Sequence, residues 1–314
     1  MKVPRLHVGA GTAVGPLSIF PIWSAARGEL GISTGTHANV AVNELPSGAQ
    51  VGKLVVTNNG PRPALLLEGE LLEGGQQHRT CAQDVVLGSG ETRTIETYCV
   101  EAGRWEAGKD SHHRLARRAP LNVRAELTSR VGIADASDRQ SRIWSSVTRF
   151  DAVRGASATS SLVEHLERPV SRRFEAAAPA PIEGQRGVLM GLGTQPLLLE
   201  MFGTHTMFRR HFRQLVDSAL LDLELLPAQV LNSGSLSGQR ARDFAALAQE
   251  PTMGTFDGGP LASIRNHGSL RSRPLKVLRG ALEGAGTAVE IPGRQPEVAH
   301  LTLWNTQHPF MKMA

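Results

Sequence analysis

The sequence is poor in aromatic residues, cysteine and lysine, and it has no long apolar run. Aromatic residues make up 4% of the 314 positions, so the core must consist mainly of leucine, valine, isoleucine and alanine. Two cysteines in so long a chain do not form a disulfide framework, and Cys81 and Cys99 are expected to be reduced. No apolar stretch approaches the roughly 20 residues of a membrane-spanning helix. The first residues also lack the apolar segment of a signal peptide. We therefore expect a cytoplasmic protein with no membrane partner.

Arginine dominates the basic residues, because only five of the 34 are lysine. Its planar guanidinium suits bidentate recognition of carboxylate or phosphate. Genome base composition gives the same bias, and we favour that explanation. A net charge of +5 is too dilute to indicate a nucleic-acid partner.

The spacing of apolar and polar residues along the chain predicts an α+β fold. We expect a mostly antiparallel sheet or sandwich with a helical middle section. Residues 51–57 and 64–67 flank the turn signal Asn-Asn-Gly-Pro at 58–61, which predicts a hairpin. A second hairpin is expected over residues 187–202. Apolar residues at helical spacing predict a long helix around 206–223.

A short segment rich in alanine and proline, residues 175–181, is the best candidate for a linker. It suggests two parts, 1–174 and 183–314. The first is a β-rich part with helices that carries the candidate site. The second is an α+β part, expected to pack with the first as one unit.

The densest polar cluster spans residues 68–79, directly after an apolar strand. Glu68 and Glu70 share a strand face, and two neighbouring carboxylates can split their pKa values into an acid and a base. Gln77 and Arg79 again share a face and offer an amide and a guanidinium. A solvated edge strand followed by a turn explains the same pattern equally well.

A second cluster spans residues 99–105. Cys99 and Glu101 share strand parity, while Arg104 and Trp105 offer an anion grip and a stacking surface. A nucleophilic Cys99 would need a base, for which His112 or His113 is available, but a buried and inert cysteine is the commoner case and is favoured.

The evidence for a metal is weak, because no histidine or cysteine pair has the spacing of a strong ligand motif. Glu68, Glu70 and Glu101 are oxygen ligands of the kind that Mg²⁺ prefers. The metal content and the oligomeric state are left open.

At these clusters the sequence resembles the ADP-ribosylglycohydrolase- and rhodanese-phosphatase-associated protein family, a bacterial and archaeal family of unsettled function. The similar pieces occur in one order between about residues 16 and 225, and the most specific are the two clusters at 68–79 and 99–105. The sequence departs from the family pattern at Glu68, Gln76 and His78, where Asp, Lys and Asn are common.

The resemblance implies a ligand related to ADP-ribose or another nucleotide. On that basis Arg79, Arg104 and Arg124 would hold a diphosphate, Trp105 would stack a base, and Glu70 or Glu101 would activate water. One hypothesis is a hydrolase in which Glu70 and Glu101 act as acid and base and Gln77 orients the ligand. The other is a non-catalytic module that binds such a ligand, or a protein partner, and regulates a nucleotide-processing enzyme.

Overall fold

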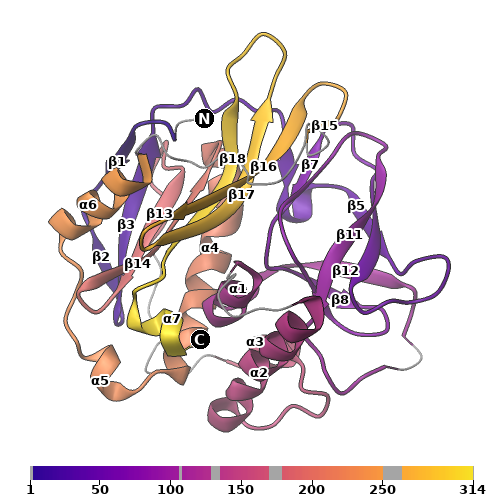
Figure 1. Cartoon of the computed structure of the whole chain (residues 1–314), viewed down its shortest axis with the longest axis horizontal. Helices are drawn as coiled ribbons and strands as arrows, with labels where there is room; N and C mark the ends of the chain where they lie inside the picture. Colours follow the sequence, from indigo (N-terminus) through magenta and orange to yellow (C-terminus); the bar gives the residue numbers. More distant parts are fainter. Residues whose placement is uncertain (1–2, 106–107, 129–134, 170–178, 250–263, 314) are drawn as a thin grey trace. The chain divides into compact units, whose positions relative to one another are not determined.

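The computed structural model describes residues 3–105, 108–128, 135–169, 179–249 and 264–313. The chain forms two compact units. The sheet unit combines Met1–Leu30, Ser171–Val216 and Leu226–Met313, and the barrel unit combines Gly31–Val170 with Asp217–Leu225. The fold is α+β with mostly antiparallel sheets, which confirms the predicted class (Figure 1). The predicted boundary between residues 174 and 183 falls largely outside the described residues.

The sheet unit contains a nine-stranded antiparallel sheet in the order β1-β3-β13-β14-β18-β17-β16-β15, with β2 paired to β3. The predicted hairpin over residues 187–202 is confirmed as β13 and β14. The strand bounds are β1 Leu6–Val8, β2 Thr12–Val14, β3 Leu17–Ser24, β13 Gly187–Leu192, β14 Gln195–Phe202, β15 Arg265–Asn266, β16 Arg271–Arg279, β17 Leu282–Glu290 and β18 Glu297–Asn305.

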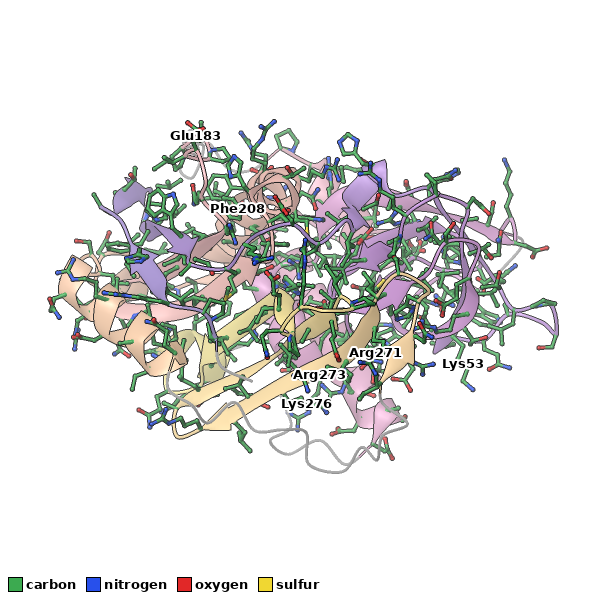
Figure 2. The ribbon with its side chains drawn as sticks, turned by 90° about the horizontal axis from the view of Figure 1, so that it is seen from above. Lys53, Glu183, Phe208, Arg271, Arg273 and Lys276 are labelled. Carbon is green, nitrogen blue, oxygen red and sulfur yellow. The ribbon has the colours of Figure 1, made fainter. Side chains whose placement is uncertain are left out.

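Helices cover the sheet because alternate residues of its strands are apolar on both faces. On β14, Leu199 and Met201 belong to the apolar cluster that includes Phe244 of α6. The intervening Phe202 lies 6.0 Å, ring centroid to centroid, from Phe208 of α4, which Figure 2 labels. The helix bounds are α4 His205–Asp222, where the long helix was predicted, α5 Ala228–Leu231, α6 Gly238–Gln249 and α7 Pro309–Met313.

The barrel unit is built around a closed six-stranded barrel in the order β11-β6-β5-β12-β8-β9 (Figure 1). A three-stranded sheet, β10-β7-β4, accompanies it. Its apolar core includes Val42, Leu54, Val56, Leu72 and Ile95. The strand bounds are β4 Ser33–Thr34, β5 Val40–Asn43, β6 Lys53–Asn58, β7 Ala64–Leu66, β8 Glu70–Gly74, β9 Arg79–Cys81, β10 Val85–Leu87, β11 Thr92–Cys99 and β12 Ser111–Arg118.

The predicted hairpin between residues 51–57 and 64–67 is wrong. Strand β6 pairs with β5 and β11, whereas β7 pairs with β4 and β10. The Asn-Asn-Gly-Pro segment stabilises loops instead of joining paired strands. The buried Asn58 Nδ2 donates to the carbonyl oxygens of Arg62, Leu87 and Gly88 at 2.9, 3.3 and 2.9 Å. Asn58 therefore ties two loops together.

Three helices of this unit, α1 Leu121–Thr128, α2 Ala136–Arg154 and α3 Leu162–Glu167, share an apolar cluster with Leu71 and Val100. Asp222 caps α1 from a distant stretch of the chain, accepting the amides of Leu121 and Asn122. Burial raises the pKa of Asp222 to about 8, although both amide hydrogen bonds act to lower it. Short 3-10 turns occur at Gly35–His37 and Leu223–Leu225.

None of the helices formed by described residues combines the length and the apolar character needed to cross a bilayer.

Candidate functional site

Strand register places a set of polar side chains inside the barrel at one end. Directly paired residues of neighbouring strands project to the same face. Arg79 pairs with Leu72 and with Cys99, and His112 pairs with Val42. Leu72 and Val42 belong to the apolar barrel core, so their polar partners also point inward. By the same rule Thr97, which pairs with the core residue Cys81, faces the interior.

Arg79 is the central cation of this interior. It is 0% exposed, and its Nη1 donates to Gln77 Oε1 at 3.1 Å. Its Nε and Nη2 are buried without a hydrogen-bond partner. Burial lowers the pKa of Arg79, and nearby Glu44 and Glu101 only partly offset that effect. A buried guanidinium with two unbound nitrogens is costly unless an acceptor completes it.

Glu44 and His112 form a buried pair near Arg79. His112 Nε2 lies 3.1 Å from Glu44 Oε1, which also accepts the amide of Gln76 at 3.1 Å. The pKa of His112 is lowered by burial, more than the hydrogen bond and charge of Glu44 raise it. The imidazole is therefore neutral at pH 7, and with Nε2 donating to Glu44, Nδ1 carries a lone pair.

Four residues, Glu44, Arg79, Thr97 and His112, are referred to here as the barrel-end cluster. Each has at least one buried side-chain atom without a hydrogen-bond partner, namely Glu44 Oε2, Arg79 Nε and Nη2, Thr97 Oγ1 and His112 Nδ1. Because buried polar groups are almost always hydrogen-bonded in proteins, this concentration of unsatisfied donors and acceptors indicates a requirement for further polar partners, such as a ligand or water.

Gly75 allows the backbone to pass close to this cluster. A Cβ there would lie 2.0 Å from His112 Nε2 and 2.7 Å from Glu44 Oε1, and the residue has a φ of 58°. Only glycine fits this position without strain or displacement. What the backbone approaches at Gly75 is therefore the imidazole of His112.

Glu101 is held in a dense hydrogen-bond network beside the cluster. Arg104 Nη2 donates to Glu101 Oε2 at 2.8 Å and Arg104 Nε to Oε1 at 3.0 Å. Thr159 Oγ1 donates to Oε1 at 2.7 Å and the His78 amide to Oε2 at 2.9 Å. Burial alone would raise the pKa of Glu101, but these hydrogen bonds lower it below the ordinary value. Glu101 is therefore an ionised carboxylate at neutral pH.

Gln77 connects this network to Arg79. Its Nε2 donates to the Glu101 carbonyl oxygen at 2.9 Å, and its Oε1 accepts from Arg79. The Arg79 Cζ also lies 5.8 Å from the ring centroid of Trp105, a cation–π distance. Trp105 is 47% exposed. The predicted residues Gln77, Arg79, Glu101, Arg104 and Trp105 therefore gather in one place.

Three other predicted residues, Glu68, Glu70 and Arg124, form their hydrogen bonds outside the barrel-end cluster and the Glu101 network. Both carboxylate oxygens of Glu68 accept from Arg124, at 3.2 Å to Oε1 and 3.1 Å to Oε2, and Oε2 also accepts from Arg118 at 3.0 Å. Glu70 Oε1 accepts from Arg114 Nε at 2.7 Å, and its Oε2 accepts the Leu67 amide at 3.2 Å. These carboxylates are thus engaged by protein donors, and their predicted role in catalysis stays a prediction.

Cys99 is buried, and burial raises the pKa of its thiol, although a backbone hydrogen bond from Glu101 and the charge of Arg79 lower it. A raised pKa leaves little thiolate at neutral pH, which favours the inert interpretation. Within the described ranges, no three His, Cys, Asp or Glu side chains gather as metal ligands. In particular, Glu68, Glu70 and Glu101 face arginines.

Glu44 and Thr97 were not singled out from the sequence. Glu44 lies two positions after Val42, so strand alternation continued past β5 would have pointed it inward. Thr97 shares parity with Cys99 on β11. What the sequence does not show is that the barrel closes and brings both residues near Arg79.

The chain matches a known protein family over most of its length. Residues 5–303 match the family described as the ARG and Rhodanese-Phosphatase-superfamily-associated Protein domain. The chain belongs to this family. The match extends well past residue 225, where the resemblance seen in the sequence ended, so it includes strands β15 to β17 and most of β18. Among curated proteins and among solved structures, no match is found.

Proposed function

We propose that the barrel-end cluster binds a small molecule carrying a phosphate or carboxylate group, in the manner of a ligand-binding or regulatory module. The observation that carries this proposal is Arg79, a fully buried guanidinium whose Nε and Nη2 are without partners. These two nitrogens lie on one edge of the guanidinium fork, which is the edge that grips an oxyanion with two parallel hydrogen bonds. Trp105 adds an exposed aromatic face beside that charge.

The family description supports a nucleotide-derived ligand by association, because it places these domains with ARG and rhodanese-phosphatase proteins. A sugar phosphate or nucleoside phosphate combines the oxyanion that Arg79 requires with a polar body. Such a body has hydroxyl groups for Thr97 and for the free Oε2 of Glu44. The bound molecule would then report to a partner enzyme.

Titration calorimetry tests this function directly. The full chain is titrated with ribose 5-phosphate, with ADP-ribose and with ribose as the uncharged control. We expect both phosphorylated ligands to bind, with an affinity that falls as salt is added, while ribose gives no measurable heat. Equal binding of ribose, or no binding of any of the three, would contradict the proposal.

A hydrolase is the second candidate, supported by the neutral His112 whose free Nδ1 lies buried in the same cluster. Such an imidazole, oriented by Glu44, suits the general base that activates water. If the protein cleaves ADP-ribose, His112→Asn should lower the turnover by roughly 10²- to 10⁴-fold with ribose 5-phosphate binding retained.

The pH profile of turnover provides a further check on this candidate. Since the pKa of His112 is lowered below 6.5, the base is unprotonated at neutral pH, and the rate should be flat there and fall only in acid. The alternative roles assigned from the sequence make a different prediction: Glu70→Gln or Glu101→Gln would abolish turnover while His112→Asn would not.

A further inference from the structure

A pocket of about 690 Å³ lies between the outside of the barrel and helix α2. One wall is the loop Gln50–Lys53 at the start of β6, the second is the segment Glu96–Tyr98 of β11, and the third is the first half of α2. Glu44, Arg79 and His112 are not among the described residues that line it, so the pocket is separate from the barrel-end cluster. A volume of this size is in the range of sites for small molecules.

Strand register places two opposite charges side by side in this pocket. Lys53 of β6 is directly paired with Glu96 of β11. The next pair along the same two strands, Leu54 and Ile95, belongs to the apolar barrel core. Because side chains alternate along a strand, Lys53 and Glu96 point outward. Both are exposed, and both line the pocket (Figure 2).

These two charges do not bind each other. Neither the Lys53 nor the Glu96 side chain forms a hydrogen bond or an ion pair with any residue that the structure describes. By contrast, Thr57 and Thr92, another outward-facing pair of the same strands, are joined by a hydrogen bond of 2.9 Å. An ammonium and a carboxylate are therefore both available to a ligand at adjacent positions.

Three other polar side chains of the pocket are bonded within the protein. Gln140 holds both backbone groups of Cys99, with Oε1 accepting and Nε2 donating at 2.8 Å. Asp135 Oδ1 accepts two amides in the first turn of α2, at 2.8 and 2.9 Å. Arg139 Nη1 donates to two carbonyl oxygens in the last turn of α1. These bonds fix the walls of the pocket around Lys53 and Glu96.

Aromatic side chains are scarce in this protein, yet two of them line this pocket. Tyr98 is the single tyrosine of the chain and comes from β11, while Trp144 comes from α2. Both are partly exposed. Tyr98 shares the outer face of β11 with Glu96, two positions away. An aromatic surface beside two opposite charges favours a ligand that combines a flat ring with both charges.

We propose that this pocket binds a free α-amino acid with an aromatic side chain. The ligand carboxylate pairs with Lys53, its ammonium pairs with Glu96, and its ring contacts Tyr98 and Trp144. Directly paired strand residues have Cα atoms roughly 5 Å apart, so two charges attached to one carbon atom can meet both partners at once. A nucleobase offers the flat ring but carries neither charge. The inference is independent of the anion-binding function proposed for the barrel-end cluster.

Titration calorimetry of the full chain tests this inference with L-phenylalanine and three molecules that each lack one of its groups. Hydrocinnamate lacks the ammonium, phenethylamine lacks the carboxylate, and L-alanine lacks the ring. L-phenylalanine should bind on the order of tenfold more tightly than L-alanine, as expected for one ring contact. It should also bind several-fold more tightly than either singly charged molecule, because each of them loses one ion pair.

Two variants assign each charge of the ligand to its partner. Lys53→Met should weaken the binding of L-phenylalanine and hydrocinnamate several-fold, because both carry the carboxylate, and should not weaken phenethylamine. Glu96→Gln should weaken L-phenylalanine and phenethylamine, which carry the ammonium, and should not weaken hydrocinnamate. This reciprocal pattern is specific to direct contact, since a general loss of structure would weaken all three ligands.

Gly52 offers a way to fill the pocket without disturbing the barrel. It lines the pocket, its φ is not in the left-handed region, and a Cβ there would meet only the Thr97 carbonyl oxygen at 4.0 Å. Gly52→Leu therefore places a branched side chain in open space and should abolish the binding of L-phenylalanine. Gly52→Ala, which adds one methyl group, is the matched control and should retain it.

The absence of L-phenylalanine binding, or binding that Gly52→Leu leaves intact, would overturn the inference. So would a result in which the uncharged adenosine binds and L-phenylalanine does not, because the pocket would then recognise a ring without charges. Binding of ribose 5-phosphate should be the same in Gly52→Leu as in the wild-type chain, so a failure here is distinguishable from a failure at the barrel-end cluster. Unfolding curves of each variant confirm that it is folded.

Discussion

Replacing Arg79 with methionine should abolish the binding of ribose 5-phosphate and, in the free protein, raise the free energy of unfolding. Two charge-assisted hydrogen bonds of roughly 1.5–3 kcal/mol each would be lost from the complex, a fall in affinity of at least about 100-fold. The free protein, in contrast, loses a buried charge that has one hydrogen bond, and methionine fills much of the same volume. We expect a gain in stability of roughly 1–3 kcal/mol, the cost of leaving a buried polar group unsatisfied. Titration calorimetry and urea unfolding measure the two effects.

Arg114 is the matched control, because its side chain belongs to the same barrel, is 5% exposed and is paired with a carboxylate. Its guanidinium pairs with Glu70 at 2.5 Å and donates to the Ala38 carbonyl oxygen at 2.9 Å. Arg114→Met leaves the Glu70 carboxylate buried and unpaired, so it should lower the free energy of unfolding by about 3–5 kcal/mol. Its affinity for ribose 5-phosphate should be unchanged where the protein is folded. If Arg79→Met destabilises the protein as much as Arg114→Met, then Arg79 is a structural residue and not a ligand-binding one.

Replacing Glu68 with glutamine should lower the free energy of unfolding by about 3–5 kcal/mol. The Glu68 side chain is 8% exposed, and it pairs with Arg118 and Arg124, whose side chains are 0% exposed. A neutral amide removes the negative charge that both buried guanidinium groups share, and its NH₂ group faces donors. Urea unfolding followed by circular dichroism measures the change.

Glu96→Gln is the control for that substitution, since Glu96 is exposed on β11 and should change stability by less than about 0.5 kcal/mol. A loss at Glu68→Gln as small as that control would mean that the two arginines are satisfied without the carboxylate. The same measurement bears on the catalytic role assigned to Glu68 from the sequence. A catalytic residue can be replaced at little cost in stability, whereas the central anion of a buried triad cannot.

Local patterns predicted the fold class and several elements, because they depend on neighbouring residues. The helix at His205–Asp222 follows from its apolar stripe, and the β13–β14 hairpin follows from two apolar runs around a glycine turn. The hairpin expected after β6 failed because the signal at Asn58 is the same whether the turn joins two paired strands or ties distant loops. Strand pairing across the closed barrel joins residues far apart in the chain, and periodicity carries no information about it.

The candidate site was predicted in part. Alternation correctly grouped Gln77 with Arg79, and the second cluster correctly supplied Glu101, Arg104 and Trp105 to the same place. The sequence could not show which arginine would be left with free nitrogens. That outcome depends on which carboxylate each one meets in space, and Arg104 and Arg124 each find a glutamate.

Closure of the six-stranded barrel also limits how a partner can associate with the barrel itself. An open sheet can recruit an extended peptide onto its last strand, but a closed barrel presents no unpaired strand for such an addition. A protein that docks on the barrel must therefore recognise side chains, loops or the covering helices. Association would therefore depend on individual surface side chains, and a single surface substitution would be enough to strengthen or weaken it.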